Sequence, residues 1–199
     1  MSRTVLYYFA PQSPWTYFGH ARLADLLARS RREVAVLPVD FGRIFAASGG
    51  LPLPQRAPQR QAYRLLELAR FAEHLGLPLN VQPRHFPVDG SPAARLITAV
   101  AQHDGTAAAM ALTGAVLAAC WAEERDIASE GTLAELLDET DLPAERLAQA
   151  RGADTQARYD AHTQAAIEAG VFGAPTYVVD GELFWGQDRL EFVARKLGF

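Results

Sequence analysis

Two short stretches carry most of the structural information in this sequence: Gln12-Ser13-Pro14-Trp15 near one end and Gly170-Val171-Phe172-Gly173-Ala174-Pro175-Thr176 near the other. The first predicts the start of a helix, because Ser13 suits the N-cap and Pro14 suits the first helical position. The second is a glycine turn whose proline suits the start of a strand. A hydroxyl at a helix N-terminus lies beside unpaired amides and partial positive charge. Together the two stretches predict a binding site for an anion beside the exposed backbone of a strand.

Hydrophobic periodicity predicts the elements around these stretches. Before residue 42 we expect β-α-β, with a strand at 5–9, a helix at 14–28 and a strand at 33–40. Residues 42–58 contain Gly49-Gly50 and several prolines, which predict a long irregular connection. Residues 59–170 are expected to be helical, with helix starts marked by Ser91, Thr132 and Asp154. Strands at 176–179 and 183–185 flank the hairpin signal Asp180-Gly181, and a helix at 188–197 follows.

The order of these elements predicts the class of fold. Without the helical block it is β-α-β-β-β-α, the order of a thioredoxin fold. We therefore expect an α/β protein with a thioredoxin fold and a large all-helical insertion. The predicted boundaries are 1–42 and 171–199 for a discontinuous thioredoxin-like domain, and 43–170 for the inserted linker and helical domain.

Composition narrows the class of function. The chain has 199 residues, of which 49% are hydrophobic, and a net charge of −4, which argues against nucleic acid and anionic membranes as partners. No apolar run is long enough to span a bilayer, and no secretory leader is apparent, so we expect a cytoplasmic protein. A single cysteine, Cys120, excludes an internal disulfide and is expected in the core. No metal is expected, because the histidines lack ligand spacing and are predicted to be surface side chains: His20, His74, His85, His103 and His162.

The sequence resembles a known family along its whole length. The stretches that carry the resemblance are Tyr8-Phe9-Ala10-Pro11-Gln12-Ser13-Pro14-Trp15-Thr16-Tyr17, Arg60-Gln61-Ala62-Tyr63, Phe71-Ala72-Glu73-His74-Leu75-Gly76-Leu77-Pro78, Ala165-Ala166-Ile167-Glu168-Ala169-Gly170 leading into the second stretch above, and Phe184-Trp185-Gly186-Gln187-Asp188-Arg189-Leu190. They are similar to the 2-hydroxychromene-2-carboxylate isomerases. These are glutathione-dependent enzymes of the kappa-class glutathione transferase group, within the DsbA-like thioredoxin superfamily.

The resemblance implies a glutathione site. In it, Ser13 stabilises the glutathione thiolate, and a cis Pro175 lets Ala174 present its backbone to the tripeptide. The charged ends of glutathione meet the residues Arg60, Gln187 and Asp188. The alternative interpretation from the residues alone is that Ser13 and Asp188 are only helix N-caps, that Pro175 starts a strand, and that Arg60 is a solvated side chain.

The resemblance also implies an activity and partners. The reaction interconverts 2-hydroxychromene-2-carboxylate and trans-o-hydroxybenzylidenepyruvate in aromatic catabolism, through reversible thiolate addition, in a homodimer. We expect Gly50, which stands where relatives often carry asparagine, in the pocket for this aromatic or unsaturated acid. Trp15 is expected there as well, only because it is close to Ser13 in the sequence. Two alternatives stay open: a kappa-class-like transferase that conjugates electrophiles with glutathione, and a non-catalytic DsbA-like module that binds thiols or peptides.

Overall fold

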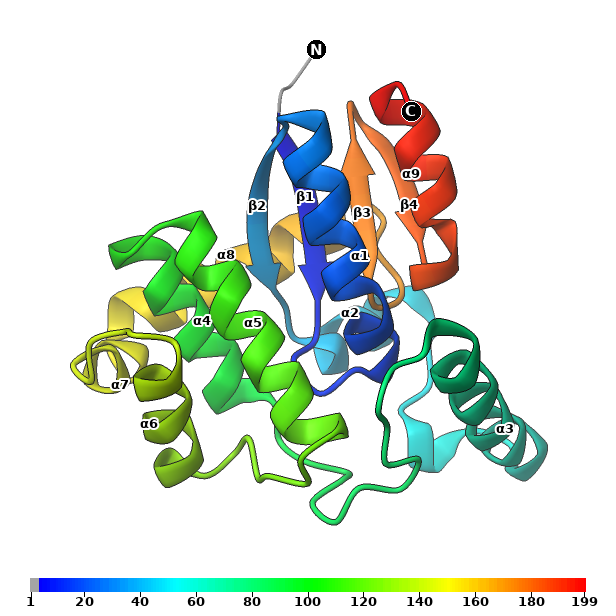
Figure 1. Ribbon diagram of the computed structural model, residues 1–199, viewed down its shortest axis with the longest axis horizontal. Helices are drawn as coiled ribbons and strands as arrows, with labels where there is room; N and C mark the ends of the chain where they lie inside the picture. Colours follow the sequence, from blue (N-terminus) through cyan, green and yellow to red (C-terminus); the bar gives the residue numbers. More distant parts are fainter. Residues whose placement is uncertain (1–3) are drawn as a thin grey trace.

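The computed structural model describes residues 4–199, which form a four-stranded sheet surrounded by helices (Figure 1). The strand order is β2-β1-β3-β4. β1 pairs in parallel with β2, whereas β3 is antiparallel to both β1 and β4. The strands are β1 (Thr4–Phe9), β2 (Glu33–Pro38), β3 (Thr176–Val179) and β4 (Glu182–Trp185). This confirms the predicted thioredoxin fold with a helical insertion between the second and third strands.

Helices cover both faces of the sheet and form the insertion. They are α1 (Pro14–Ser30), α2 (Phe41–Ser48), α3 (Pro58–Leu75), α4 (Ser91–His103), α5 (Thr106–Trp121), α6 (Glu130–Glu139), α7 (Arg146–Ala150), α8 (Ala153–Glu168) and α9 (Leu190–Leu197), with short 3-10 helices η1 (Leu53–Gln55) and η2 (Gln187–Arg189). None of the helices within residues 4–199 has the length and apolar character needed to cross a bilayer.

Two buried clusters lie on opposite faces of the sheet, because successive strand side chains alternate in direction. Tyr7 belongs to the larger cluster, together with Phe18 of α1 and Leu96 of α4. Tyr8 points the other way, into a smaller cluster with Ile44 of α2 and with residues of α8. In Figure 1, α1 and α9 accordingly lie in front of the sheet, with α8 behind it.

The prediction of an irregular connection over residues 42–58 is wrong in its first part, because α2 occupies residues 41–48. Asp40 caps this helix, with Oδ1 accepting from the N–H groups of Gly42 at 2.7 Å and Arg43 at 3.4 Å. Burial of Ile44 under the sheet holds the helix in place, and Gly49 ends it in the left-handed conformation. The glycines and prolines therefore mark the end of a helix and the linker that follows it.

Three predicted helix starts are displaced by one to three residues. α4 takes Gly90 as its N-cap, α6 takes Ser129 and α8 takes Gly152, none of them with a side-chain cap bond. The expected capping roles of Ser91, Thr132 and Asp154 are therefore wrong, since each lies inside its helix. The hairpin prediction is confirmed: Asp180 and Gly181 join β3 to β4 with φ of 51° and 83°.

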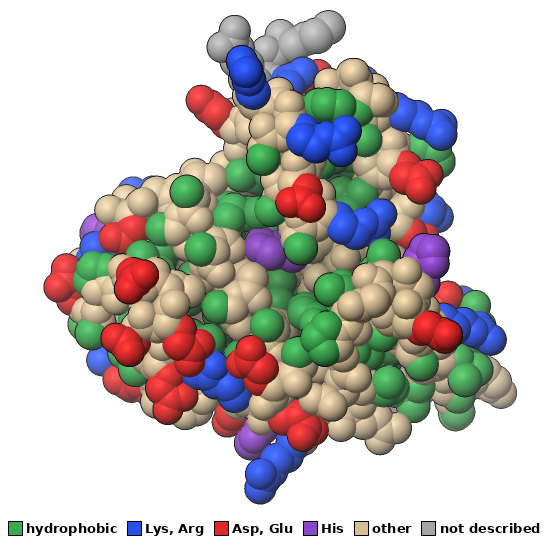
Figure 2. Space-filling view, in the orientation of Figure 1, with side chains coloured by type: hydrophobic (Ala, Val, Ile, Leu, Met, Phe, Trp, Pro, Cys, Tyr) green, Lys and Arg blue, Asp and Glu red, His purple; other side chains and the backbone are tan. Residues whose placement is uncertain are grey.

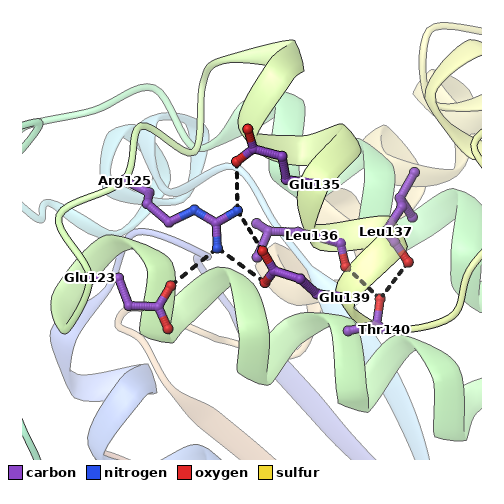
Figure 3. Close-up of polar contacts among 7 residues, drawn as sticks. All are labelled: Glu123, Arg125, Glu135, Leu136, Leu137, Glu139 and Thr140. Atoms are coloured by element: carbon purple, nitrogen blue, oxygen red, sulfur yellow. Dashed lines mark hydrogen bonds and ion pairs between the residues drawn. The ribbon is translucent and has the colours of Figure 1, made fainter.

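Two arginines connect different elements of the helical insertion to each other. Arg146 makes a bidentate pair with Asp104, with distances of 2.6 and 2.8 Å, and both side chains are largely buried. Figure 3 shows a second cluster, in which the Arg125 guanidinium contacts Glu123, Glu135 and Glu139 and thereby ties the loop after α5 to α6. The acidic partners raise the pKa of Arg125 further above its usual range.

The predicted division into two domains stays a prediction. α2 spans the proposed boundary at residues 42 and 43. The larger buried cluster also contains residues from both parts, among them Tyr7 of β1 and Leu112 of α5.

Two side-chain environments bear on the sequence predictions. Cys120 is buried, as predicted, and burial raises the pKa of its thiol to about 12. The prediction of a surface side chain is wrong for His20, which is 8% exposed because α1 packs against β1 and α5 at this point. The Nδ1 atom of His20 lies 3.3 Å from the Tyr7 hydroxyl and its Nε2 lies 3.0 Å from the Met110 carbonyl oxygen.

Candidate functional site

The sheet topology brings the two informative stretches to one end of the molecule. Tyr8, near the end of β1, pairs with Thr176 at the start of β3, and Thr176 pairs with Trp185 at the end of β4. The turn before α1, the segment before β3 and the turn after β4 therefore meet at the same sheet end. A hydrogen bond of 2.9 Å from the Gly186 N–H to the Pro175 carbonyl joins the last two.

Ser13 is the N-cap of α1, as predicted. Its Oγ accepts a hydrogen bond of 3.3 Å from the Thr16 N–H, and its own N–H donates to the Ala10 carbonyl at 3.0 Å. Since the oxygen acts as acceptor, the hydroxyl proton is left to donate to another group. The first turn of α1 contains no acidic residue, so the positive end of the helix dipole is not neutralised there. Ser13 is therefore suited to stabilise an anion.

The segment before β3 contains a residue, Ala174, whose backbone N–H and C=O are both free to bind a ligand. The Ala174–Pro175 peptide bond is cis, as the resemblance implies. The Pro175 carbonyl is occupied by Gly186, but within residues 4–199 neither the N–H nor the C=O of Ala174 makes a hydrogen bond. A donor and an acceptor on one residue at the end of a sheet are what an extended peptide needs in order to pair with it.

A cavity of about 1000 Å³ opens beside these segments, between α3 and the sheet end. Six of the predicted site residues line it, whereas Ser13 and Pro175 lie outside the lining. The six are Trp15, Gly50, Arg60, Ala174, Gln187 and Asp188. Sites that enclose small molecules typically have volumes of about 300–1,000 Å³, so this one has room for a tripeptide and a small second ligand.

Gln187 and Asp188 are held by neighbouring arginines. The buried Gln187 accepts from Nη1 of Arg22 through its side-chain oxygen at 2.8 Å, which leaves its amide N–H groups to donate. Asp188 pairs with Arg189 at 2.6 Å and is about half exposed. The N-cap of α9 is Arg189, so the alternative in which Asp188 caps the closing helix does not hold.

The cavity wall is aromatic and carries more cations than anions. Sequence reasoning missed most of this wall, which includes Phe45, Arg56, Tyr63, Arg64, Phe71, Phe172, Trp185 and Arg189. The sequence did contain one signal for this wall: Arg56, Arg60 and Arg64 follow each other at intervals of four residues, which places Arg60 and Arg64 on one face of α3. On the face of the molecule shown in Figure 2, acidic and basic side chains are interspersed.

The described residues hold no group of three or more His, Cys, Asp or Glu side chains placed to bind a metal ion. Residue 16, where disulfide oxidoreductases of this fold carry the second cysteine of their motif, is a threonine, and the buried Cys120 belongs to α5. Any thiol chemistry at Ser13 therefore requires a thiol from a ligand.

Comparison with known proteins identifies the class. The DSBA-like thioredoxin domain family matches residues 4–198, and the chain therefore belongs to this family. The chain is 28% identical to a 2-hydroxychromene-2-carboxylate isomerase of Sphingobium xenophagum, over 97% of each sequence. A protein of the same name from Pseudomonas putida is also 28% identical, over 96% of this chain and 93% of that protein.

Solved structures agree with this class. A structure of 2-hydroxychromene-2-carboxylate isomerase matches with a TM-score of 0.82 and 26% identity, over 98% of this chain and 94% of that one. The cytosolic disulfide reductase DsbM from Pseudomonas aeruginosa, in a structure with GSH, matches with a TM-score of 0.71 and 20% identity, over 97% and 93% of the two chains. The second likeness concerns the fold alone.

Proposed function

We propose that this protein is a glutathione-dependent isomerase that interconverts 2-hydroxychromene-2-carboxylate and trans-o-hydroxybenzylidenepyruvate. The observation that carries the proposal is the meeting of the Ser13 N-cap with the unpaired Ala174 backbone at one sheet end. The full-length similarity to proteins named for this reaction supports it. Disulfide exchange is disfavoured because the single cysteine of the chain, Cys120, is buried in α5.

The residues at the site fit glutathione. The Ala174 N–H and C=O can pair with the backbone of its cysteine, as an added strand would. The carboxylates of glutathione can be held by Arg60, which is exposed at the rim, and by the Gln187 amide. Asp188 offers a carboxylate to the γ-glutamyl ammonium. The cavity is large enough for the tripeptide together with a flat acid.

Bound glutathione supplies a thiolate that adds reversibly to a conjugated double bond, so that rotation takes place about a single bond. The task of this chain is to keep that sulfur anionic. Lowering a thiol pKa from about 8.5 to about 6.5 needs about 2.7 kcal/mol. A hydroxyl that donates to an anion contributes about 1.5–3 kcal/mol, and a helix N-terminus up to about 1–2 kcal/mol. Ser13 at the start of α1 can therefore do this without a general base.

The test uses purified protein, 2-hydroxychromene-2-carboxylate and a substoichiometric amount of glutathione. We expect both isomers to reach one equilibrium mixture from either side, with the glutathione recovered unchanged. Ser13→Ala should slow the reaction at least about tenfold, while Ser48→Ala, an exposed serine at the end of α2, should not. Stoichiometric loss of glutathione with an electrophile such as 1-chloro-2,4-dinitrobenzene would instead support a transferase. Binding of glutathione without either reaction would support a non-catalytic module.

The expected homodimer and cytoplasmic location belong to the same proposal. Phe172, Trp185 and Phe192 are each about half exposed around β4 and α9, which gives this edge apolar surface that a second copy could cover. Sedimentation equilibrium measures the assembly directly, and a monomer at all concentrations would contradict the homodimer.

A further inference from the structure

We propose that Arg64 binds the carboxylate of the acidic substrate, in a subsite of the cavity separate from the glutathione residues. This inference rests on the proposed function and adds to it the residue that selects acids. The residues that carry the inference lie along one face of α3.

Six residues of α3 line the cavity, and four of them follow one another at helical spacing: Arg60, Arg64, Glu67 and Phe71. Arg60 lies in the exposed first turn, whereas Arg64 lies one turn further in and is half-buried. Its guanidinium carbon stands 5.2 Å from the ring centre of Phe86 and 5.7 Å from that of Trp121. Trp121 is fully buried in the core and Phe86 packs against it, so these rings fix the position of the charge.

Arg64 differs from the other partly buried arginines of residues 4–199 in having neither an anion nor a hydrogen-bond acceptor. Arg22, Arg56 and Arg95 donate to uncharged oxygens. Arg146 is paired with Asp104, and Arg125 with three glutamates. Among residues 4–199 Arg64 has no ion pair, and Glu67, which lines the same wall, forms none with it. Burial, and then the neighbouring charge of Arg56, lower the pKa of Arg64 to about 10. A partly buried cation that faces a cavity without a counter-ion is stabilised by an anionic ligand.

The surroundings suit a flat unsaturated acid. Phe71 lies seven residues beyond Arg64, about 10 Å along the helix, and packs edge-on against Trp15 at 5.8 Å between ring centres. Trp15 comes two residues after Ser13, so this pair of rings connects the α3 wall of the cavity to the start of α1. A conjugated acid about 10 Å long can contact both rings, with its carboxylate at the guanidinium of Arg64 and its double bond toward Ser13.

The test measures the binding of two matched probes by calorimetry, in the presence of S-methylglutathione so that no addition takes place. The probes are trans-2-hydroxycinnamate and its neutral amide. We expect the wild type to bind the carboxylate at least about tenfold more tightly than the amide. Arg64→Met should abolish most of this preference, whereas Arg64→Lys should keep part of it. Arg158→Met, an exposed arginine of α8 outside the cavity lining, is the matched control and should change nothing.

Kinetics separate substrate binding from a structural role. Loss of a carboxylate contact raises KM and leaves kcat nearly unchanged, because the contact is equally present before and during reaction. The melting temperature of each variant shows whether it folds. Equal affinity of the wild type for acid and amide would overturn the inference even if Arg64→Met did not fold. An unchanged preference in Arg64→Met would overturn it too. Failure of S-methylglutathione to bind would instead count against the proposed function.

Discussion

The buried imidazole of His20 predicts that mild acid destabilises the fold. Its Nε2 lies 3.0 Å from the carbonyl oxygen of Met110, which can only accept, so this nitrogen carries the proton. The Nδ1 atom then accepts from the Tyr7 hydroxyl, 3.3 Å away. The imidazole is therefore neutral in the folded protein. Burial lowers the pKa of His20 from its ordinary 6.5 to about 4.

The magnitude follows from the difference between these two pKa values. Between pH 6.5 and about 4, the unfolded chain binds a proton at His20 that the folded chain does not. The free energy of unfolding therefore decreases as the pH falls through this window, by about 2 kcal/mol at about pH 5 and about 3 kcal/mol when complete. His162 acts in the same direction, since burial lowers its pKa as well.

Urea unfolding at about pH 7.5 and about pH 5 measures this effect. His20→Gln keeps a side chain that can donate to Met110 and accept from Tyr7, but it has no titrating group. We expect it to lose about 2 kcal/mol less than the wild type on acidification. His162→Gln is the matched control, and its free energy of unfolding should still decrease by the amount that is due to His20. The same loss in wild type and His20→Gln, or an imidazole of His20 that titrates near 6.5 in the folded protein, would refute this reasoning.

Two further predictions concern a largely buried ion pair of the insertion and the packing of the cavity wall. Asp104→Asn should lower the free energy of unfolding, measured with urea at neutral pH, by about 1–3 kcal/mol, because it weakens the largely buried bidentate pair with Arg146. The control is Glu130→Gln, which weakens the exposed pair with Arg151 and should change the free energy of unfolding by less than about 0.5 kcal/mol. The hydrogen bond with Arg146 lowers the pKa of Asp104 below its ordinary value of 3.8. The stabilisation by this pair should therefore be complete above about pH 4 and be lost as the pH falls through the lowered pKa. A cost of Asp104→Asn that does not depend on pH would contradict this reasoning. Gly173→Ala should weaken glutathione binding measured by calorimetry and cost about 1–3 kcal/mol of stability, because its Cβ would collide with the Trp185 ring of the cavity wall; unchanged binding would show that this wall does not shape the site.

The parts of the fold that depend on local signals could be predicted from the sequence. Ser13-Pro14 start α1, and Asp180-Gly181 form a turn, because each depends on the conformational preferences of adjacent residues. α2 was missed because the glycines and prolines after it outweighed a short helix whose signals were the Asp40 cap and the buried Ile44. Such a helix owes its stability to the sheet that it covers.

The parts of the site that depend on distant contacts could not be predicted. The sequence indicates that Arg60 and Arg64 share a face of α3, but only packing shows that this face lines the cavity. It is likewise the neighbourhood of β1 and α5 that buries His20, since Tyr7 and Met110 are far from it in the sequence. In contrast, the backbone of Ala174 was predictable through the motif around it.

The central claim is that Ser13 makes the sulfur of bound glutathione anionic, and ultraviolet titration of the thiolate in the complex tests it most directly. In the wild type we predict a thiol pKa about 2 units below the value of about 8.5 for a free thiol. In Ser13→Ala we predict a pKa about 1–2 units higher than in the wild type, because the hydroxyl contributes about 1.5–3 kcal/mol to the anion. The same thiol pKa in both complexes would contradict the account.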